Sequence, residues 1–448
     1  MIDHIKKKYL SPESHLTEVL KKSSHSLLVN IGGLIGGLLL SIFLGQALGV
    51  EGFGIISLAV KIGSIILIFC LLGMKRIIVK EVAIGVENER WAYIHNVMRS
   101  SYIINGGMTL IITTILALLA PYLSNYFFND ARLSVPLIII TMSVVPQVFS
   151  KIFSSGLLGF NKIWQGNFID QSVDYLAVGG ILLALWFSSV EINIVTVAIS
   201  YLVGRFIIVL GFGIYYREIF SFNFSVKETS FVGGRLLKTS LPLLLVGASG
   251  IIASNADSIM IGWLSSSHEV GLYVVAARVA LLTSLLLQVT NSAVSPKIAA
   301  FYSKGEQKKI EELVQKITAL LIVLAIVPLA IFFLFGSKIL SVWGSEFSEG
   351  YWILIILSIG QLFNLSTGSA GLILMLCGQE KLQGLISISF VILNLILNYF
   401  FILYYGVTGA AFATAITVAG KNIMQVIFVK KNIGISTLPT HWKYFSIN

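Results

Sequence analysis

Charged residues are scarce in this sequence. Asp, Glu, Lys and Arg together make up 12% of its 448 residues, whereas soluble domains carry about 25%. Cysteine is also rare: Cys70 and Cys377 each lie inside an apolar run, without the spacing of a disulfide framework or a zinc site. The sequence contains neither HExxH nor the P-loop pattern GxxxxGK followed by Ser or Thr. We therefore expect no metal centre, no cofactor and no bound ATP.

Hydrophobic sequence is abundant. Hydrophobic residues supply 56% of the chain and gather in runs of about 20, the length that spans a bilayer as a helix. We interpret the chain as an all-α integral membrane protein with twelve transmembrane helices. The predicted spans are 25–48, 53–73, 101–120, 133–154, 168–188, 192–214, 240–264, 270–293, 318–336, 351–376, 383–403 and 408–429.

The distribution of Lys and Arg predicts the orientation of these helices. The segments assigned to the cytoplasm carry 25 of these cations, and the outside loops carry only Arg132 and Lys338. This bias places both termini in the cytoplasm. The net charge of +10 then reflects topology, and we expect no nucleic-acid partner. Near the N-terminus, Ser11-Pro12 is typical of a helix start and predicts a short amphipathic helix on the membrane surface.

The two halves of the sequence resemble each other. LGQALGVEGFGIISLAVKIGS (44–64) is similar to IGWLSSSHEVGLYVVAARVAL (261–281). A constant offset of 217 relates the glycines and the cations of the two stretches, Gly54 to Gly271 and Lys61 to Arg278. Because each half has six predicted spans, both halves have the same orientation. This pattern predicts parallel repeats with a substrate site between them.

The repeat predicts the domain organisation. We expect two six-helix bundles joined by a basic cytoplasmic linker and flanked by cytoplasmic tails. The predicted segments are an amphipathic tail at 1–24, a bundle at 25–215, the linker at 216–239, a second bundle at 240–429 and a tail at 430–448.

Several stretches resemble one known family. LGVEGFGIISLAV (48–60), LLGMKRIIVKEVA (71–83), NADSIMIGWLSSSHEVGLYVVAARVA (255–280) and GQEK (378–381) are similar to the polysaccharide-transporter branch of the MOP superfamily. This branch holds the Wzx-type flippases of lipid-linked oligosaccharides. The resemblance covers roughly residues 25 to 430 and indicates the superfamily, but not the substrate.

The resemblance implies a fold and a function. The fold would be a MATE-like, V-shaped transporter of two six-helix bundles. The implied activity is movement of an undecaprenyl-pyrophosphate-linked glycan across the bacterial cytoplasmic (inner) membrane by alternating access, for O antigen, capsule or exopolysaccharide. The implied partners are this glycan lipid, membrane lipids and the polysaccharide polymerase machinery. The chain itself would not be an enzyme.

Charges inside the predicted spans are the candidate site residues. The embedded cations are Lys61, Arg205, Arg278 and Lys421, and the clearly embedded carboxylates are Asp174 and Asp257. Two positive charges are left in excess, and an unpaired charge in hydrocarbon costs at least about 2.5–3.5 kcal/mol. A water-filled cavity that receives an anion removes this cost. We predict Lys61 and Arg278 as pseudo-symmetric cavity cations that bind substrate, with Arg205 and Lys421 as further candidates in the cytoplasmic half.

A structural interpretation of these charges stays open. Arg278 then pairs with Asp257, Arg205 pairs with Asp174, and the two lysines extend to headgroups. Asp257 is either the charge partner of Arg278 or a carboxylate that couples a proton or an ion to transport. Elsewhere, the GxxxG spacing in IGGLIGG (31–37) predicts close helix packing, and segment 75–100 predicts a basic amphipathic helix at the inner surface.

The sequence disfavours two other functions. A MATE-type drug/cation antiporter is disfavoured because a cavity for cationic drugs should be acidic. A membrane glycan polymerase or ligase needs a reaction site at the outer surface, usually on a sizeable external loop. The longest outside connection is short, roughly 337–350, and contains no carboxylate–histidine cluster.

Overall fold

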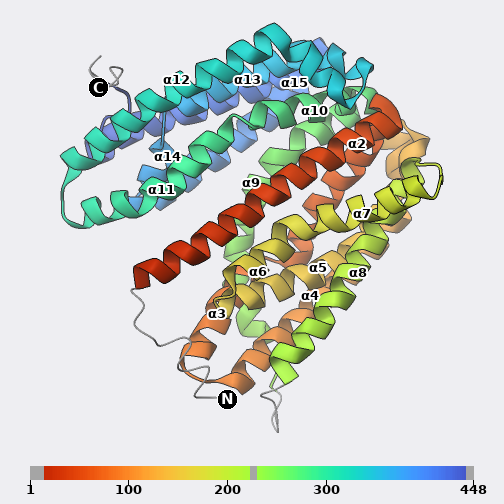
Figure 1. Ribbon diagram of the computed structural model, residues 1–448, viewed down its shortest axis with the longest axis horizontal. Helices are drawn as coiled ribbons and strands as arrows, with labels where there is room; N and C mark the ends of the chain where they lie inside the picture. The colour runs from red at the N-terminus through yellow and green to blue at the C-terminus, as the bar shows by residue number, and fades with distance from the viewer. Residues whose placement is uncertain (1–14, 222–229, 440–448) are drawn as a thin grey trace. The chain divides into compact units, whose positions relative to one another are not determined.

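The computed structural model describes residues 15–221 and 230–439, and these residues form helices without any strand. Figure 1 shows the helices and the short connections between them. The principal helices are α2 (His15–Leu71), α3 (Met74–Glu87), α4 (Trp91–Tyr122), α5 (Ser134–Gly159), α6 (Ile163–Asn167), α7 (Val173–Phe187), α8 (Ile194–Ser221), α9 (Gly233–Leu264), α10 (Ser267–Leu281), α11 (Ser284–Ser303), α12 (Gln307–Leu340), α13 (Tyr351–Ser366), α14 (Ala370–Leu376) and α15 (Glu380–Ile433). The π-helical turns are η1 (Leu123–Phe127) and η3 (Phe168–Ser172), and the 3-10 turns are η2 (Ala131–Leu133), η4 (Ser341–Trp343) and η5 (Ser345–Gly350).

Many of these helices are suited to a membrane. Seven helices in the described ranges are long and apolar enough to cross it, or up to ten if each bent pair counts as one span. One bent pair is α10 with α11, which lie at 41° to each other, and another is the pair formed by η5–α13 and α14, at 45°. The expected all-α membrane fold is therefore confirmed, while the count of twelve stays a prediction.

Two helices contain an internal break. α2 has non-helical backbone at Gly49 (φ 66°), and α15 has it at Gly406 (φ 59°). Both φ values lie in the left-handed region, which glycine adopts without steric cost. The breaks fall between the first and second predicted spans and between the eleventh and twelfth.

The described chain divides into two compact units. The first comprises Met1–Ser41, Ile66–Ala117 and Ile139–Leu245, and the second comprises Ile42–Ile65, Leu118–Ile138 and Val246–Asn448. These units are defined by compactness, whereas the predicted bundles follow from the repeat, so the bundle boundaries stay a prediction. The expected helix start at Ser11-Pro12, part of the basic linker (222–229) and the end of the C-terminal tail (440–448) lie outside the described residues.

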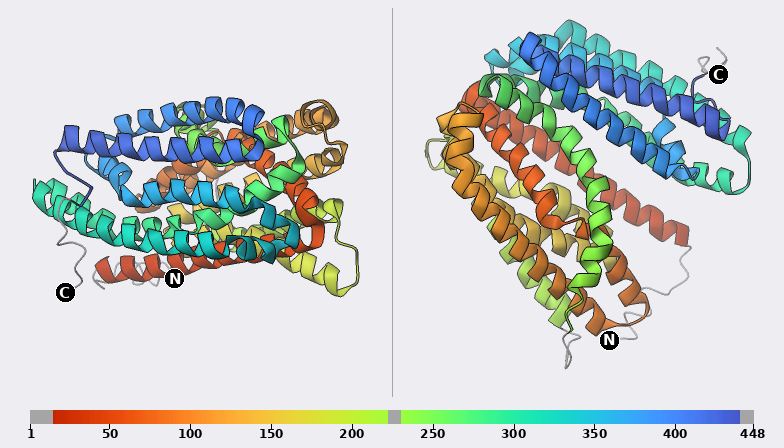
Figure 2. Two further views of the ribbon diagram at one scale, coloured as in Figure 1. Left: turned by 90° about the horizontal axis from the view of Figure 1, so that it is seen from above. Right: turned by 180° about the vertical axis from the view of Figure 1, so that it is seen from behind.

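The first unit is built on close helix contacts. α7 and α8 run side by side (Figures 1 and 2). The GxxxG stretch of α2 packs against the start of α7: a Cβ on Gly33 would come within 2.5 Å of Ser172 Oγ, and one on Gly37 within 3.2 Å of the Tyr175 ring. The predicted packing role is thus confirmed for Gly33 and Gly37, whereas a Cβ on Gly32 would meet nothing within 4 Å and one on Gly36 would make an ordinary contact at 3.7 Å. α3 is amphipathic as expected: it buries Ile77 and Ile78, and Arg76 and Lys80 are exposed, while Lys75 is half-buried. It ends at Glu87, so the predicted helix over 75–100 is divided between α3 and α4.

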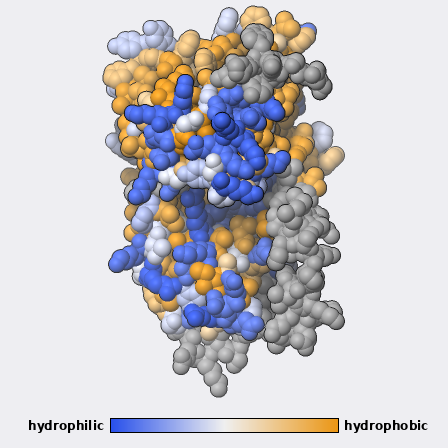
Figure 3. Space-filling model, turned by 90° about the vertical axis from the view of Figure 1, so that its left-hand side faces the viewer, coloured by the Kyte–Doolittle hydropathy of each residue, from blue (hydrophilic) through white to orange (hydrophobic). Residues whose placement is uncertain are grey.

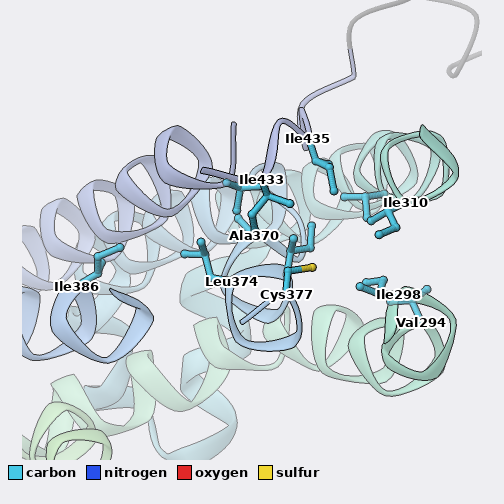
Figure 4. Packing of buried hydrophobic residues seen from close by; sticks show 12 residues of the cluster. Val294, Ile298, Ile310, Ala370, Leu374, Cys377, Ile386, Ile433 and Ile435 are labelled. Carbon is cyan, nitrogen blue, oxygen red and sulfur yellow. The ribbon is translucent and has the colours of Figure 1, made fainter. Parts of the chain in front are cut away.

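The second unit contains an apolar core. α12, α13 and α15 lie side by side (Figures 1 and 2). Where α14 meets α11, α12 and α15, buried aliphatic side chains surround Cys377, which is 2% exposed (Figure 4). The free thiol therefore behaves as a small apolar group. On the face drawn in Figure 3, hydrophilic residues gather and are bordered by hydrophobic ones.

Candidate functional site

The two repeat-related glycines lie against each other in the second unit. A Cβ on Gly54 would overlap the carbonyl oxygen of Ser267 and come within 3.0 Å of Gly271 N. A Cβ on Gly271 would in turn overlap the carbonyl oxygen of Val50. Ser267 stands 217 residues after Val50, so the contact is reciprocal: each repeat presents the same glycine to the same carbonyl of the other. Glycine is required because only a residue without a Cβ permits this approach.

Two contacts between acidic and basic side chains near the glycines also repeat. Arg132 Nη1 lies 2.7 Å from Glu51 Oε2, and His268 Nε2 lies 4.0 Å from Glu349 Oε2. The offset of 217 takes Glu51 to His268 and Arg132 to Glu349, so the second pair occupies the same positions with the acidic and basic partners exchanged. Both observations agree with the parallel repeat that the sequence predicts.

Lys61 and Arg278 both belong to the second unit, on α2 and α10, and both are half-buried. Lys61 Nζ lies 3.4 Å from the carbonyl oxygen of Ser254 on α9. Asp257 belongs to the same unit, so three of the predicted site residues lie in one compact unit.

Asp257 is held by neutral donors. It is 7% exposed. Its Oδ2 accepts hydrogen bonds from the Tyr273 hydroxyl (2.6 Å) and the Thr414 hydroxyl (2.7 Å), and its Oδ1 accepts one from Asn398 Nδ2 (2.9 Å). These donors come from α10 and α15. Burial of a carboxylate costs free energy unless hydrogen bonds or a cation compensate.

Two amide oxygens beside this carboxylate lack partners. Oδ1 of Asn394 and Oδ1 of Asn398 are buried without a hydrogen bond among the described residues. The amide nitrogen of Asn394 faces the hydroxyls of Thr414 (3.4 Å) and Thr417 (3.3 Å). A carboxylate, amide oxygens and hydroxyls are hard oxygen ligands of the kind that bind small cations. Among the described residues, no group of three His, Cys, Asp or Glu is placed to hold a metal ion.

Arg205 and Asp174 lie together in the first unit. Arg205 is 7% exposed, and its Nε lies 3.7 Å from Asp174 Oδ2. Its Nη1 is 2.6 Å from the Ser143 hydroxyl, and its guanidinium lies over the Tyr201 ring at 5.5 Å. Gln147 Nε2 donates to Asp174 Oδ2 at 3.2 Å. This is the geometry of the structural interpretation, in which the two charges pair.

Lys421 is half-buried on α15 in the second unit, while Arg205 belongs to the first. No hydrogen bond or ion pair of Lys421 is recorded within the described ranges. Its role as a substrate-binding cation stays a prediction.

The partners of Asp257 were not predicted from the sequence. Asn394 and Asn398 are four residues apart in the apolar stretch ILNLILNYF (392–400), so they share one face of a helix. Two amides on one face of a membrane span are a signal that polar chemistry faces the bundle interior.

The structure is similar to solved structures of membrane transporters. The structure resembles an inward-facing multidrug resistance MATE family transporter of the MOP superfamily (TM-score 0.71, 14% identity, 90% of this chain and 94% of that chain). It also resembles lipid II flippase MurJ in an inward closed conformation (TM-score 0.70, 16% identity, 92% and 87%). The chain is thus a multi-pass membrane protein with the MOP superfamily fold.

The family profile described as polysaccharide biosynthesis protein matches residues 19–302, and the MatE profile matches residues 242–400. The chain belongs to the polysaccharide biosynthesis protein family, within the polysaccharide-transporter branch of the MOP superfamily.

Three curated relatives were compared. The probable low-salt glycan biosynthesis flippase Agl15 of Haloferax volcanii is 30% identical over 213 residues, which are 47% of this chain and 45% of that protein. The chain thus matches less than half of that relative. The probable flippase AglR of the same organism is 25% identical over 95% of this chain and 86% of its own length. The putative O-antigen transporter of Shigella flexneri is 24% identical over 84% of this chain and 89% of its own length.

Proposed function

We propose that this protein is a flippase that moves an undecaprenyl-pyrophosphate-linked oligosaccharide across the bacterial cytoplasmic membrane for surface polysaccharide synthesis. Relatives named as flippases and as an O-antigen transporter support the transport class. The observation that carries the proposal is the placement of two repeat-related cations, Lys61 and Arg278, in one compact unit. The polymer it serves is O antigen, capsule or exopolysaccharide, and the polymerase machinery is the proposed protein partner.

The proposed topology has twelve spans with both termini in the cytoplasm. α15 has 54 residues, which would extend about 81 Å at 1.5 Å per residue, against about 30 Å of hydrocarbon. We infer that α2 and α15 each supply two spans, separated at Gly49 and Gly406. Counting each as two raises the ten candidate spans to twelve.

The charges of the second unit favour an anionic substrate. Two predicted membrane cations, Lys61 and Arg278, and one predicted membrane carboxylate, Asp257, belong to this unit. A net positive charge remains whatever hydrogen bonds the individual groups make. A pyrophosphate matches this excess, because a guanidinium offers a fork of donors and an ammonium offers a compact charge. Substrate binding at these residues and at Lys421 is part of the proposal, whereas the position of Arg205 beside Asp174 favours a structural role for that cation.

Asp257 is proposed as the carboxylate that couples an ion to transport. Its partners Tyr273, Thr414 and Asn398 are neutral, and the amide oxygen of Asn398 is buried without a partner. A proton or a monovalent cation at this position would satisfy the buried charge. When the proton or cation leaves, the Asp257 carboxylate is negatively charged again. The unit therefore has two states, one with a neutralised carboxylate and one with a charged carboxylate.

Replacement of Arg278 tests the proposed function. In a strain that depends on this protein for surface polysaccharide, Arg278→Glu should abolish export while the protein still inserts and accumulates. The matched control is Lys338→Glu, which makes the same charge change at an exposed position and should leave export intact. Near-wild-type export from well-expressed Arg278→Glu would refute the proposed role of this cation.

Deletion of the gene tests the substrate class. The lipid-linked oligosaccharide should then accumulate on the cytoplasmic face. Unchanged surface polysaccharide in a deletion strain without a redundant transporter would overturn the proposal.

The MatE profile match over residues 242–400 favours one second candidate, a drug/cation antiporter. Efflux of cationic dyes that rises with expression, and survives Arg278→Glu, would select this function over the flippase.

A further inference from the structure

A cluster of two lysines and one aspartate lies in the first unit, apart from the candidate residues above. Lys75 Nζ, on α3, lies 2.8 Å from both carboxylate oxygens of Asp170. Lys151 Nζ, on α5, lies 3.2 Å from Asp170 Oδ1 and also donates to the backbone carbonyl of Asp170. The single carboxylate of Asp170 therefore interacts with two ammonium groups.

The carboxylate is fixed in place by its backbone. Asp170 belongs to the π-helical turn η3, a type of turn found frequently at functional sites. The turn is anchored to α2, because the Ser172 hydroxyl donates to the carbonyl oxygen of Val29 (2.8 Å) and Gly33 packs against Ser172. Lys151 adds a second anchor through the Asp170 carbonyl. These contacts thus hold Asp170 and Lys151 in fixed positions.

Lys75 is the accessible member of the cluster. Its side chain is 36% exposed, compared with 12% for Lys151 and 16% for Asp170. An incoming anion can reach its ammonium group from the surface without displacing the buried pair.

The neighbouring carboxylate does not neutralise the cluster. Asp174, one turn further along, is already engaged by Arg205 and Gln147. A net positive charge consequently remains on Lys75, Lys151 and Asp170 in a partly buried setting, where it favours a bound anion.

The predicted topology places the cluster at the level of lipid phosphates. Lys75 follows the second predicted span, Lys151 ends the fourth and Asp170 begins the fifth. All three positions are cytoplasmic ends. Basic pockets between transmembrane helices on the cytoplasmic side bind lipid headgroups.

We propose that Lys75, Lys151 and Asp170 form a binding site for the phosphate group of a lipid in the cytoplasmic leaflet. The phosphate binds the ammonium group of Lys75, the most exposed member of the cluster, while Asp170 keeps its bonds to Lys151. In the absence of the lipid, the carboxylate of Asp170 accepts the hydrogen bonds of Lys75 in place of the phosphate. The site holds its ligand whether or not the protein translocates it.

Lipid binding to the full-length protein in phosphatidylcholine nanodiscs tests this site. The probes are a fluorescent undecaprenyl diphosphate and phosphatidylglycerol. Lys75→Gln should weaken binding about fivefold, the factor that corresponds to one lysine near an anionic membrane surface. Asp170→Asn should strengthen it, because Lys75 is released from its internal partner. The matched control is Lys162→Gln, since Lys162 is half-buried over the Tyr215 ring (5.4 Å) and outside the cluster; it should bind like the wild type.

Lys75→Gln keeps the Asp170–Lys151 pair, so it remains informative if Asp170→Asn does not fold. A response with undecaprenyl diphosphate alone identifies the site as one for the carrier lipid, and a response with both probes identifies it as a general phospholipid site. Unchanged binding of both probes by Lys75→Gln would overturn the proposal, as would binding of inorganic phosphate without either lipid. Phosphatidylglycerol binding by Lys75→Gln and polysaccharide export by Arg278→Glu are independent measurements, so this test and the export test can fail separately.

Discussion

The two compact units hold their buried carboxylates in different ways. In the first unit, Asp174 and Asp170 each face cations, Arg205 in one case and two lysines in the other. In the second unit, Asp257 accepts its hydrogen bonds from a tyrosine, a threonine and an asparagine. All three carboxylates lie on predicted membrane helices, so the surrounding hydrocarbon does not explain the difference.

The difference separates fixed charge from exchangeable charge. A carboxylate paired with an arginine is neutralised permanently, because the guanidinium stays protonated. A carboxylate among neutral donors keeps its charge and can exchange a proton or a cation. The first arrangement stabilises the helices that carry it, and the second gives a unit a charge that transport can change.

The largest predicted effect concerns the ion pair between Arg205 and Asp174. Asp174→Asn leaves Arg205 buried without a carboxylate, and breaking a buried pair in this way costs about 3–5 kcal/mol. The free energy of unfolding, measured in detergent with denaturant, should fall by this amount. The double variant Arg205→Met/Asp174→Leu should recover most of the loss. A fall of less than about 1 kcal/mol in Asp174→Asn would show that the pair is not a fixed charge.

The next effect concerns the exchangeable carboxylate. Asp257→Asn should leave the fold intact, because the three recognised hydrogen-bond donors to Asp257 are neutral side chains. Transport in proteoliposomes should nevertheless fall at least about tenfold, equivalent to about 1.4 kcal/mol, and lose its dependence on sodium or proton gradients. Asp257→Glu retains a carboxylate and should retain that dependence. Gradient-dependent transport by Asp257→Asn would contradict ion coupling at this position.

A smaller effect tests the neutral donors themselves. Tyr273→Phe removes one hydrogen bond to the Asp257 carboxylate, and hydrogen bonds to charged groups contribute about 1.5–3 kcal/mol. The free energy of unfolding should fall toward the lower end of this range. The same substitution in an Asp257→Asn background should cost less, and a double-mutant cycle measures the difference. Equal costs in both backgrounds would mean that Asp257 is not charged in the folded protein.

The smallest effect concerns Asp130, outside the membrane-spanning segments. Burial raises its pKa, but hydrogen bonds from Arg132 and Ser267 outweigh burial and hold the pKa below its ordinary value. A carboxyl of this kind stabilises the fold above its unfolded pKa of about 3.9, and the contribution disappears as pH falls through the lower native pKa. Asp130→Asn should therefore flatten the loss of stability below about pH 4. At pH 7 the cost should be below about 1 kcal/mol, because Arg132 is 55% exposed. Identical acid denaturation curves would exclude this contribution.

The fold class could be predicted from the sequence because long apolar runs admit few alternatives to membrane helices. The bends could not. The 41° angle between α10 and α11 falls inside a predicted span, 270–293, with neither glycine nor proline at the break. Tertiary packing rather than local propensity determines such a bend.

The candidate site was predictable only in part. The repeat predicted that Lys61 and Arg278 correspond, and the structure places both in one unit. The donors to Asp257 escaped prediction because Thr414 and Asn398 are ordinary neutral residues, more than 140 positions away along the chain. A count of charges detects cations and carboxylates but gives no weight to neutral donors.

The reciprocal contact of Gly54 and Gly271 bears on the origin of the protein. A contact in which each half offers the same atoms to the other is isologous, the type formed by two identical subunits about a twofold axis. Such a contact is suited to a six-helix ancestor that worked as a homodimer, with this glycine at its dyad. In a chain that arose by duplication and fusion of such an ancestor, each half would be free to diverge. The contacts Glu51–Arg132 and His268–Glu349, with acidic and basic residues exchanged, fit this origin.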